Sequence, residues 1–94
     1  MDSLEYRVVT QPGDRIRVYL TGNAANVLVM DDENFQNYRN GLPYRYYGGY
    51  YRRTPAIIKP AVYGDLNVVV NLGGYAGNLG AVVQVLHTTR RRRA

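Results

Sequence analysis

The chain has no cysteine, a single histidine, His87, and a single serine, Ser3. Without cysteine, neither a disulfide framework nor a thiolate zinc site can form, which fits a reducing cytoplasm. One histidine and one serine make a Ser-His-Asp triad implausible and exclude a histidine-rich metal site. His87 is expected to be a structural or neutral residue at a strand end. We therefore expect no enzyme, no metal ion and no cofactor.

Long hydrophobic runs are also missing, since no stretch approaches the roughly 20 apolar residues that span a bilayer. The first residues, Met1–Glu5, carry acids where a signal peptide needs basic residues and an apolar run. These absences predict a cytoplasmic protein without a membrane partner.

The size and composition of the chain are those of one globular domain, with 94 residues of which 46% are hydrophobic and 20% are charged. The net charge of +5 is uneven, because four of the 12 basic residues lie at Arg90–Arg93, which leaves eight basic residues against seven acidic ones. We expect a single β domain over residues 1–89. Residues 90–94 form a basic tail that is either disordered or contacts nucleic acid or another anion.

The apolar pattern repeats every second residue, most clearly where Ile16, Val18 and Leu20 share one face. Asn26–Met30 is almost continuously apolar, which indicates a central strand covered on both faces. The Pro-Gly turn at Gln11–Asp14 predicts that the first two strands pair as a hairpin. No helix of crossover length separates the strands, so we expect an all-β antiparallel sandwich or small barrel of about six or seven strands. The expected strands are residues 6–10, 15–20, 26–30, 56–58, 66–72 and 81–86.

One short helix is expected at residues 31–40. Asp31 or Asp32 can cap its free N–H groups, and Phe35 and Tyr38 lie three residues apart on one face. The acids at residues 31–33 could instead bind a divalent cation or perform acid–base chemistry. Capping and the helix dipole explain them more simply.

Tyrosine and arginine are concentrated in residues 38–53, where six of the ten tyrosines lie. Tyrosine can stack on a base and arginine can hold a phosphate, so the segment suits a pocket for a small nucleotide-like ligand. The same residues are typical anchors of a protein interface. In a third interpretation the segment is an ordinary strand pair, with Gly48 and Gly49 as its hairpin turn. The candidate binding residues are Arg39, Tyr44, Arg45, Tyr46, Tyr47, Gly48, Gly49, Tyr50 and Arg52.

Two further function classes stay open. Single-stranded nucleic acid could bind Arg15 and Arg17, the tyrosine-rich segment and the tail. A homo-oligomer could form through an exposed edge strand at Ile57–Ile58. The glycine-rich residues 71–78 lack the Lys-Ser/Thr pair of a phosphate loop and are expected to form a hairpin loop.

The segment Asn26–Phe35, followed by Tyr38-Arg39 and Tyr44–Tyr51, resembles a bacterial family known as the domain of unknown function numbered 1883. The likeness continues from about Tyr6 to Leu86. In that family tryptophan is frequent where this chain has Leu66, and histidine or serine where it has Tyr50 and Tyr63. The resemblance implies a compact, mostly β domain, found alone or attached to Toll/interleukin-receptor-type domains, without established activity. By analogy it favours a sensing or adaptor role.

Overall fold

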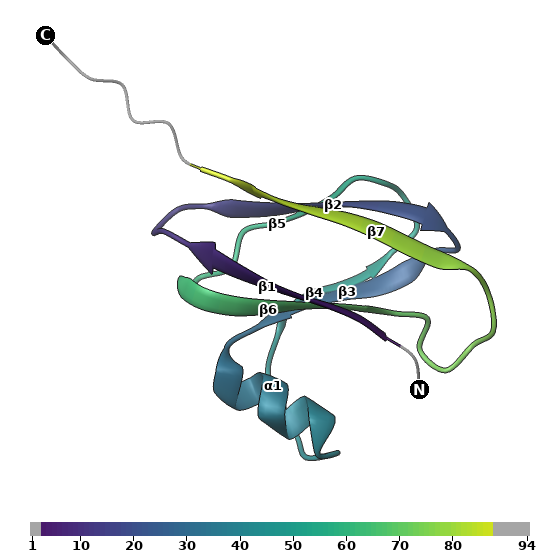
Figure 1. Ribbon diagram of the computed structural model, residues 1–94, viewed down its shortest axis with the longest axis horizontal. Helices are drawn as coiled ribbons and strands as arrows, with labels where there is room; N and C mark the ends of the chain where they lie inside the picture. The colour runs from purple at the N-terminus through teal and green to yellow at the C-terminus, as the bar shows by residue number, and fades with distance from the viewer. Residues whose placement is uncertain (1–2, 88–94) are drawn as a thin grey trace, which may run out of the picture.

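The protein is a sandwich of two antiparallel sheets with one helix on the outside, as seen in the computed structural model, which describes residues 3–87 (Figure 1). The four-stranded sheet has the order β1-β6-β3-β4, and the three-stranded sheet has the order β5-β2-β7. The expected all-β sandwich with one short helix is confirmed. The basic tail at Arg90–Arg93 lies outside the described residues. The elements are β1 (Ser3–Thr10), β2 (Arg15–Gly22), β3 (Ala25–Met30), α1 (Asp32–Arg39), β4 (Tyr47–Tyr51), β5 (Ala56–Ile58), β6 (Gly64–Asn71) and β7 (Leu79–Leu86).

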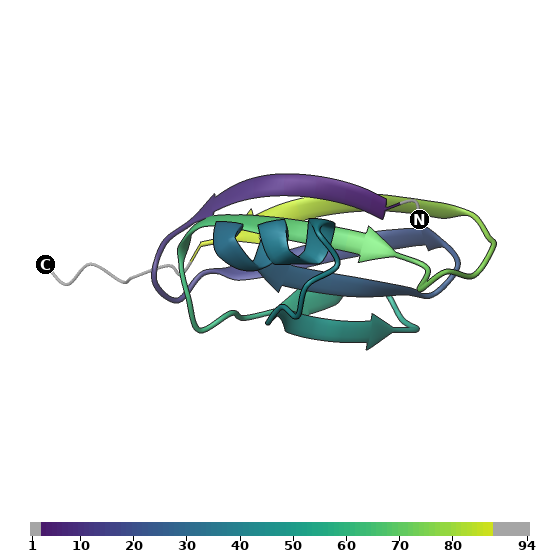
Figure 2. The same ribbon diagram turned by 90° about the horizontal axis from the view of Figure 1, so that it is seen from below.

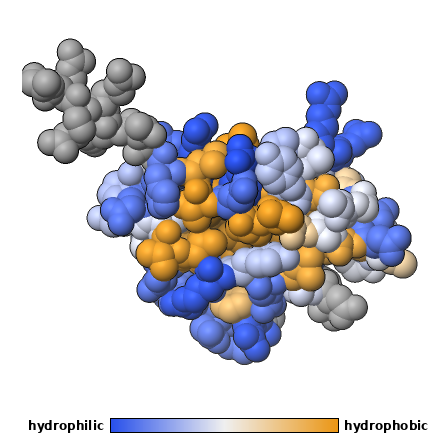
Figure 3. All heavy atoms as spheres, turned by 45° about the horizontal axis from the view of Figure 1, so that its top comes forward, coloured by the Kyte–Doolittle hydropathy of each residue, from blue (hydrophilic) through white to orange (hydrophobic). Residues whose placement is uncertain are grey.

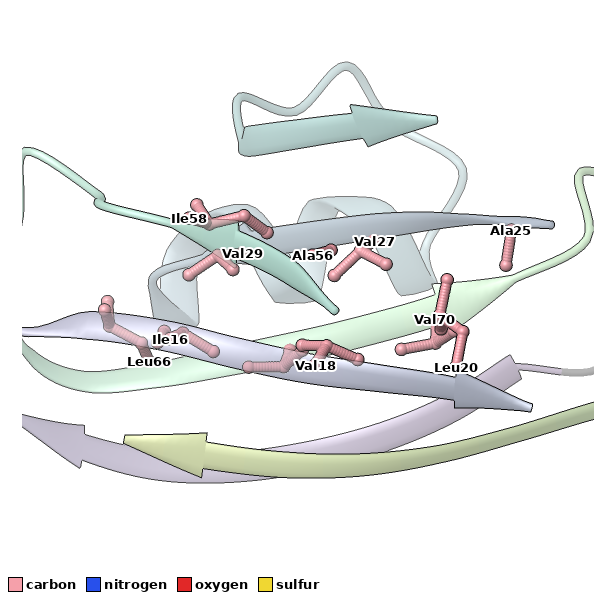
Figure 4. Close-up of a cluster of buried hydrophobic side chains, with 11 residues drawn as sticks. Ile16, Val18, Leu20, Ala25, Val27, Val29, Ala56, Ile58, Leu66 and Val70 are labelled. Carbon is pink, nitrogen blue, oxygen red and sulfur yellow. The ribbon is translucent and has the colours of Figure 1, made fainter. Parts of the chain in front are cut away.

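The hydrophobic core lies between the two sheets (Figure 4). Alternation along β2 directs Ile16, Val18 and Leu20 into this core and leaves Tyr19 on the outside, as the sequence pattern predicts. The facing sheet contributes Val27 of β3 and other inward residues of β3 and β6. The fully buried members of the core are mostly β-branched, which suits the pleated surface of a strand.

Strand β3 is covered on both faces, as its continuous apolar run predicts. Val27 and Val29 face the core between the sheets, whereas Leu28 and Met30 belong to a second buried cluster on the outer face. Helix α1 lies over that outer face (Figure 2). The outward apolar residues of β3 therefore form part of the surface on which α1 packs.

The predicted hairpin between the first two strands is wrong. Strand β1 pairs with β6, and β2 pairs with β5 and β7. The turn itself forms, because the Asp14 N–H donates to the Gln11 carbonyl at 3.0 Å and the Gln11 N–H donates to Asp14 Oδ2 at 2.8 Å. The turn connects β1 in one sheet to β2 in the other. Each of these two strands pairs with an eight-residue strand far along the sequence, β1 with β6 and β2 with β7.

The loop at residues 72–78 likewise crosses between sheets and does not join a hairpin, because β6 and β7 belong to different sheets. On that side of the sandwich β1 and β7 lie close together, and the Tyr6 hydroxyl donates to the Ala81 carbonyl at 3.3 Å. The inward side chains of both strands are only partly buried. Figure 3 shows hydrophobic residues gathered in a band across this part of the surface. The sandwich is thus less tightly closed here than at its centre.

The helix is eight residues long, and within residues 3–87 no helix has the length and apolar character needed to cross a membrane.

Candidate functional site

Helix α1 begins with the cap that the sequence predicts. Asp31 is the N-cap residue, and its Oδ1 accepts from the Asn34 backbone N–H and from Asn34 Nδ2, both at 2.9 Å. Asp32 and Glu33 follow in the first turn, where negative charge complements the helix dipole. In the part of the chain that the structure describes, no group of three or more His, Asp or Glu residues is placed to hold a metal ion. Helix formation accounts for the acidic cluster.

The helix is attached to the four-stranded sheet by an aromatic cluster. Phe35 and Tyr38 of the helix and Tyr44 of the following segment pack on the outward apolar residues of β3 and β6. The rings of Phe35 and Tyr38 are stacked with their centroids 6.4 Å apart. The edge of one ring meets the face of the other between Tyr38 and Tyr44, at 5.1 Å. This packing holds the segment after the helix against the sheet.

A charged cluster attaches the start of the helix to the sheet. Both oxygens of the Asp32 carboxylate accept from the Arg7 guanidinium, at 3.1 and 2.9 Å, and Oδ1 also accepts from Asn67 Nδ2 at 2.8 Å. The hydrogen bond from Asn67, followed by the one from Arg7, lowers the pKa of Asp32 below its ordinary value of 3.8. The carboxylate therefore stays charged in mildly acidic solution.

The lowered pKa of Asp32 makes this attachment sensitive to acid. Its contribution to stability is present above the ordinary pKa and is lost as pH falls through the lower pKa of the folded state. Replacement Arg7→Gln removes the positive charge and the paired hydrogen bonds of the guanidinium, both of which lower this pKa, so we expect the pKa of Asp32 to rise. A carboxyl-detected NMR titration of both proteins measures this. An unchanged titration midpoint would show that Arg7 does not act on Asp32.

The segment between α1 and β4 is hydrogen-bonded to the helix. The Arg45 backbone N–H donates to Asn34 Oδ1 at 2.7 Å, so the same asparagine contacts the helix cap and this segment. The Tyr44 ring lies between Tyr38 and Tyr46, with the Tyr46 centroid 5.8 Å away. Burial, followed by the two neighbouring phenols, raises the pKa of Tyr44 above 10.0. Its hydroxyl is consequently protonated and available to donate at neutral pH.

Four of the predicted binding residues come together in one groove of about 570 Å³. We call this the Tyr/Arg groove, and it is lined by Met30, Asp31, Asn34, Tyr44, Arg45, Tyr46, Tyr47 and Val62. Tyr46 and Tyr47 are 46% and 37% exposed, so their rings are accessible. The Arg45 side chain makes no ion pair with any residue in the range 3–87. The groove therefore offers aromatic faces beside a cation that is free to bind.

The remaining predicted residues lie elsewhere. The Arg39 guanidinium lies over the Phe35 ring at 5.6 Å and does not line the groove. Tyr50 is exposed on β4 and lines a separate hollow, and Arg52 is exposed in the bend after β4. The structure thus brings four of the nine predicted residues into the groove and places Arg39, Tyr50 and Arg52 outside it.

Gly48 and Gly49 lie within β4, so the alternative interpretation of these residues as a hairpin turn is wrong. Gly48 pairs with Leu28 and has a φ of +117°. A Cβ atom at Gly48 would overlap the carbonyl oxygen of Val27, so only glycine lets the two backbones come this close. The backbone that Gly48 admits is that of the neighbouring strand β3.

Sequence reasoning missed part of the groove. Met30 and Val62 line it from β3 and from the segment after β5, which are distant in the chain. Asp31 and Asn34 were recognisable only as residues of the helix cap region. Their shared position at the start of α1, just before the tyrosine-rich segment, is the one signal that could have linked them to the site.

The fold and the groove define a small β-sandwich domain with an aromatic surface depression. The family described as "Domain of unknown function (DUF1883)" matches residues 8–89. The chain therefore belongs to this family, as the sequence resemblance predicts. No curated protein and no solved structure matches the chain significantly.

Proposed function

We propose that this domain is a non-catalytic binding module that holds a small nucleotide-like ligand in the Tyr/Arg groove. The observation that supports this function is Arg45, an exposed guanidinium without a carboxylate partner among the described residues, located beside three tyrosine rings. In a larger protein such a module would act as a sensor or adaptor for an attached effector domain.

The groove has the size and the chemistry that such a ligand needs. Its volume of about 570 Å³ lies within the usual range of small-molecule sites. A planar base can stack on Tyr46 or Tyr47, and a phosphate can accept paired hydrogen bonds from Arg45. Asp31 Oδ2 makes no hydrogen bond within residues 3–87, so it can accept from an amino or hydroxyl group of the ligand.

Replacement Arg45→Ala should weaken nucleotide binding at least about tenfold, because it removes a charge-assisted hydrogen bond to phosphate. The melting temperature should hardly change, since the side chain is exposed and makes no ion pair. Isothermal titration calorimetry with nucleoside monophosphates and cyclic dinucleotides measures the affinities of the unmodified protein and of the Arg45→Ala variant.

Arg52→Ala is the matched control, because Arg52 is an exposed arginine outside the groove. It should bind like the unmodified protein. Equal affinities of the Arg45 and Arg52 variants, or the absence of binding to any nucleotide of the panel, would contradict the proposed function.

A protein partner is the second candidate, because large apolar residues that are close in sequence to groove-lining residues are exposed. Leu42 is 53% exposed and Tyr63 is 63% exposed, and Val62 lies at the wall of the groove. Aromatic residues and arginine dominate the binding energy of many interfaces. A stable complex in light scattering, together with no response to nucleotides, would favour this candidate.

Nucleic-acid binding is supported less well by the arrangement of the arginines. Arg15 and Arg17 lie on β2, in the sheet opposite the one that carries the Tyr/Arg groove. Arg17 also donates to Gln84 Oε1 at 2.9 and 2.7 Å and lies over the Tyr19 ring. One strand would have to pass around the sandwich to contact both surfaces. A steep loss of affinity with added salt would identify this mode.

Self-association through β5 is also less favoured. The strand is an edge strand, as predicted, and Ile57 is 47% exposed. It is only three residues long, however, and Pro55 and Pro60 lie close to its two ends. Short edge strands and nearby prolines disfavour pairing with another chain.

A further inference from the structure

The outer face of the four-stranded sheet is only partly covered by helix α1. The helix lies across one end of this face and leaves the other end open, beside the loop that follows β6 (Figure 2). Asn26 of β3 and Asn71 of β6 are direct cross-strand partners at the open end. Their carboxamides are the polar floor of a surface bordered by tyrosine and aliphatic side chains.

Two adjoining hollows, of about 520 and 270 Å³, occupy this open end and share Asn26 and Gly73. We call them together the Tyr/Asn groove. Tyr38, Tyr44 and Tyr46 border it near the helix, and Tyr50 and Tyr75 border the other end. The other lining residues are Asn23, Ala24, Leu28, Asn71, Leu72 and Ala76. Among residues 3–87, no charged side chain lines either hollow.

The floor of this groove is held in place by a chain of hydrogen bonds. The buried Asn71 accepts through Oδ1 from Asn26 Nδ2 at 3.1 Å and from the Gly73 N–H at 2.9 Å. Asn71 Nδ2 donates to the Tyr38 hydroxyl at 3.1 Å. Asn71 thereby orients Asn26, which keeps its carbonyl oxygen and one N–H free of partners within residues 3–87.

Tyr50 and Tyr75 are the most exposed aromatic residues of the groove. Tyr50 is 63% exposed and Tyr75 is 82% exposed, so both rings present apolar faces to solvent beside the Asn26 amide. A bound molecule would contact the flat apolar faces of the tyrosine rings and, beside them, the N–H donor and the oxygen acceptor of the Asn26 carboxamide.

We infer that the Tyr/Asn groove binds a neutral saccharide. A pyranose ring has apolar C–H faces that can pack on tyrosine, and its neighbouring hydroxyls can donate to and accept from one carboxamide. An anionic ligand would find no cation among the described residues that line the groove, and a purely apolar ligand would leave the Asn26 amide buried without a partner. The charge-free lining with an oriented amide therefore selects a polyhydroxylated neutral ligand.

This site is separate from the proposed nucleotide site, although Tyr44 and Tyr46 border both. Arg45 lines only the Tyr/Arg groove, and Tyr50 lines only the Tyr/Asn groove. Variants of these two residues consequently distinguish failure of one proposal from failure of the other.

The experiment is an NMR titration of the full chain with neutral tetrasaccharides built from glucose, mannose or N-acetylglucosamine. At least one of them should shift the amide signals of Asn26, Tyr50 and Gly73. Tyr50→Ala should weaken its binding about tenfold or more, and Asn26→Ala should do the same. Tyr63→Ala is the matched control, because Tyr63 is as exposed as Tyr50 at 63% and lines neither groove.

Four outcomes would overturn the inference. The first is the absence of shifts with every tetrasaccharide at about 10 mM. The second is a set of shifts that excludes Asn26 and Tyr50. The third is an equal loss of binding in the Tyr50 and Tyr63 variants. Arg45→Ala should bind the saccharide normally, so a loss there would likewise contradict a separate site.

Discussion

Replacement Gly48→Ala should lower the free energy of unfolding by about 3 kcal/mol, because the new Cβ atom adds backbone strain and steric overlap. Gly48 has a φ of +117°, and a Cβ there would overlap the Val27 carbonyl oxygen and lie 3.2 Å from Ile58 Cδ1. Neither neighbour can move away without disturbing β3 or the core. Thermal denaturation should show a melting temperature lowered by about 12 °C or more.

Gly49→Ala is the matched control for this change. Gly49 is the next residue of β4 and also has a positive φ, of +159°, but a Cβ there would meet no atom within 4 Å. We expect a much smaller loss of stability. Equal melting temperatures of the two variants would show that β4 does not pack against β3 as closely as the structure indicates.

Replacement Leu66→Ala should cost about 2–5 kcal/mol of stability, because it leaves a cavity in a tightly packed core. Leu66 is 1% exposed and belongs to the cluster between the sheets. Chemical denaturation followed by circular dichroism measures the change in the free energy of unfolding.

Leu42→Ala makes the same chemical change on the surface, since Leu42 is 53% exposed. It should alter stability by no more than about 0.5 kcal/mol. A loss of stability in the Leu42 variant as large as that in the Leu66 variant would contradict the assignment of the core.

The helix and every strand except β4 could be predicted because their signals are local. Alternation at Ile16, Val18 and Leu20 depends only on which face of β2 is buried, and the cap at Asp31 depends only on its neighbours. The apolar run of β3 likewise indicated burial on both faces. These features need no knowledge of the rest of the chain.

Strand partners could not be predicted in the same way. Residues Gln11–Asp14 can form the same turn whether the second strand pairs with the first as a hairpin or enters the other sheet. The choice depends on β6 and β7, which supply long ladders from the far end of the sequence. For the same reason Gly48 resembled a turn residue, although its role is close contact with the Val27 backbone.

The central residues of the candidate site could be predicted, but the residues that other parts of the chain contribute to it could not. Tyr44–Tyr47 are consecutive, so a local signal was sufficient to find them. The path of the chain decides which other residues join them, and it brings Val62 to this groove while it places Tyr50 at the other. Asn26 and Asn71 gave no signal as a pair, since their partnership exists only across β3 and β6.

Binding at the Tyr/Arg groove is tested by an NMR titration of the full chain and its Arg45→Ala variant with nucleoside monophosphates and cyclic dinucleotides. We expect at least one nucleotide to shift the amide signals of Asn34, Arg45 and Tyr47, and these shifts to disappear in the variant. No shifts with any nucleotide, or shifts centred on β2 in the opposite sheet, would contradict the proposal that the Tyr/Arg groove is the binding site.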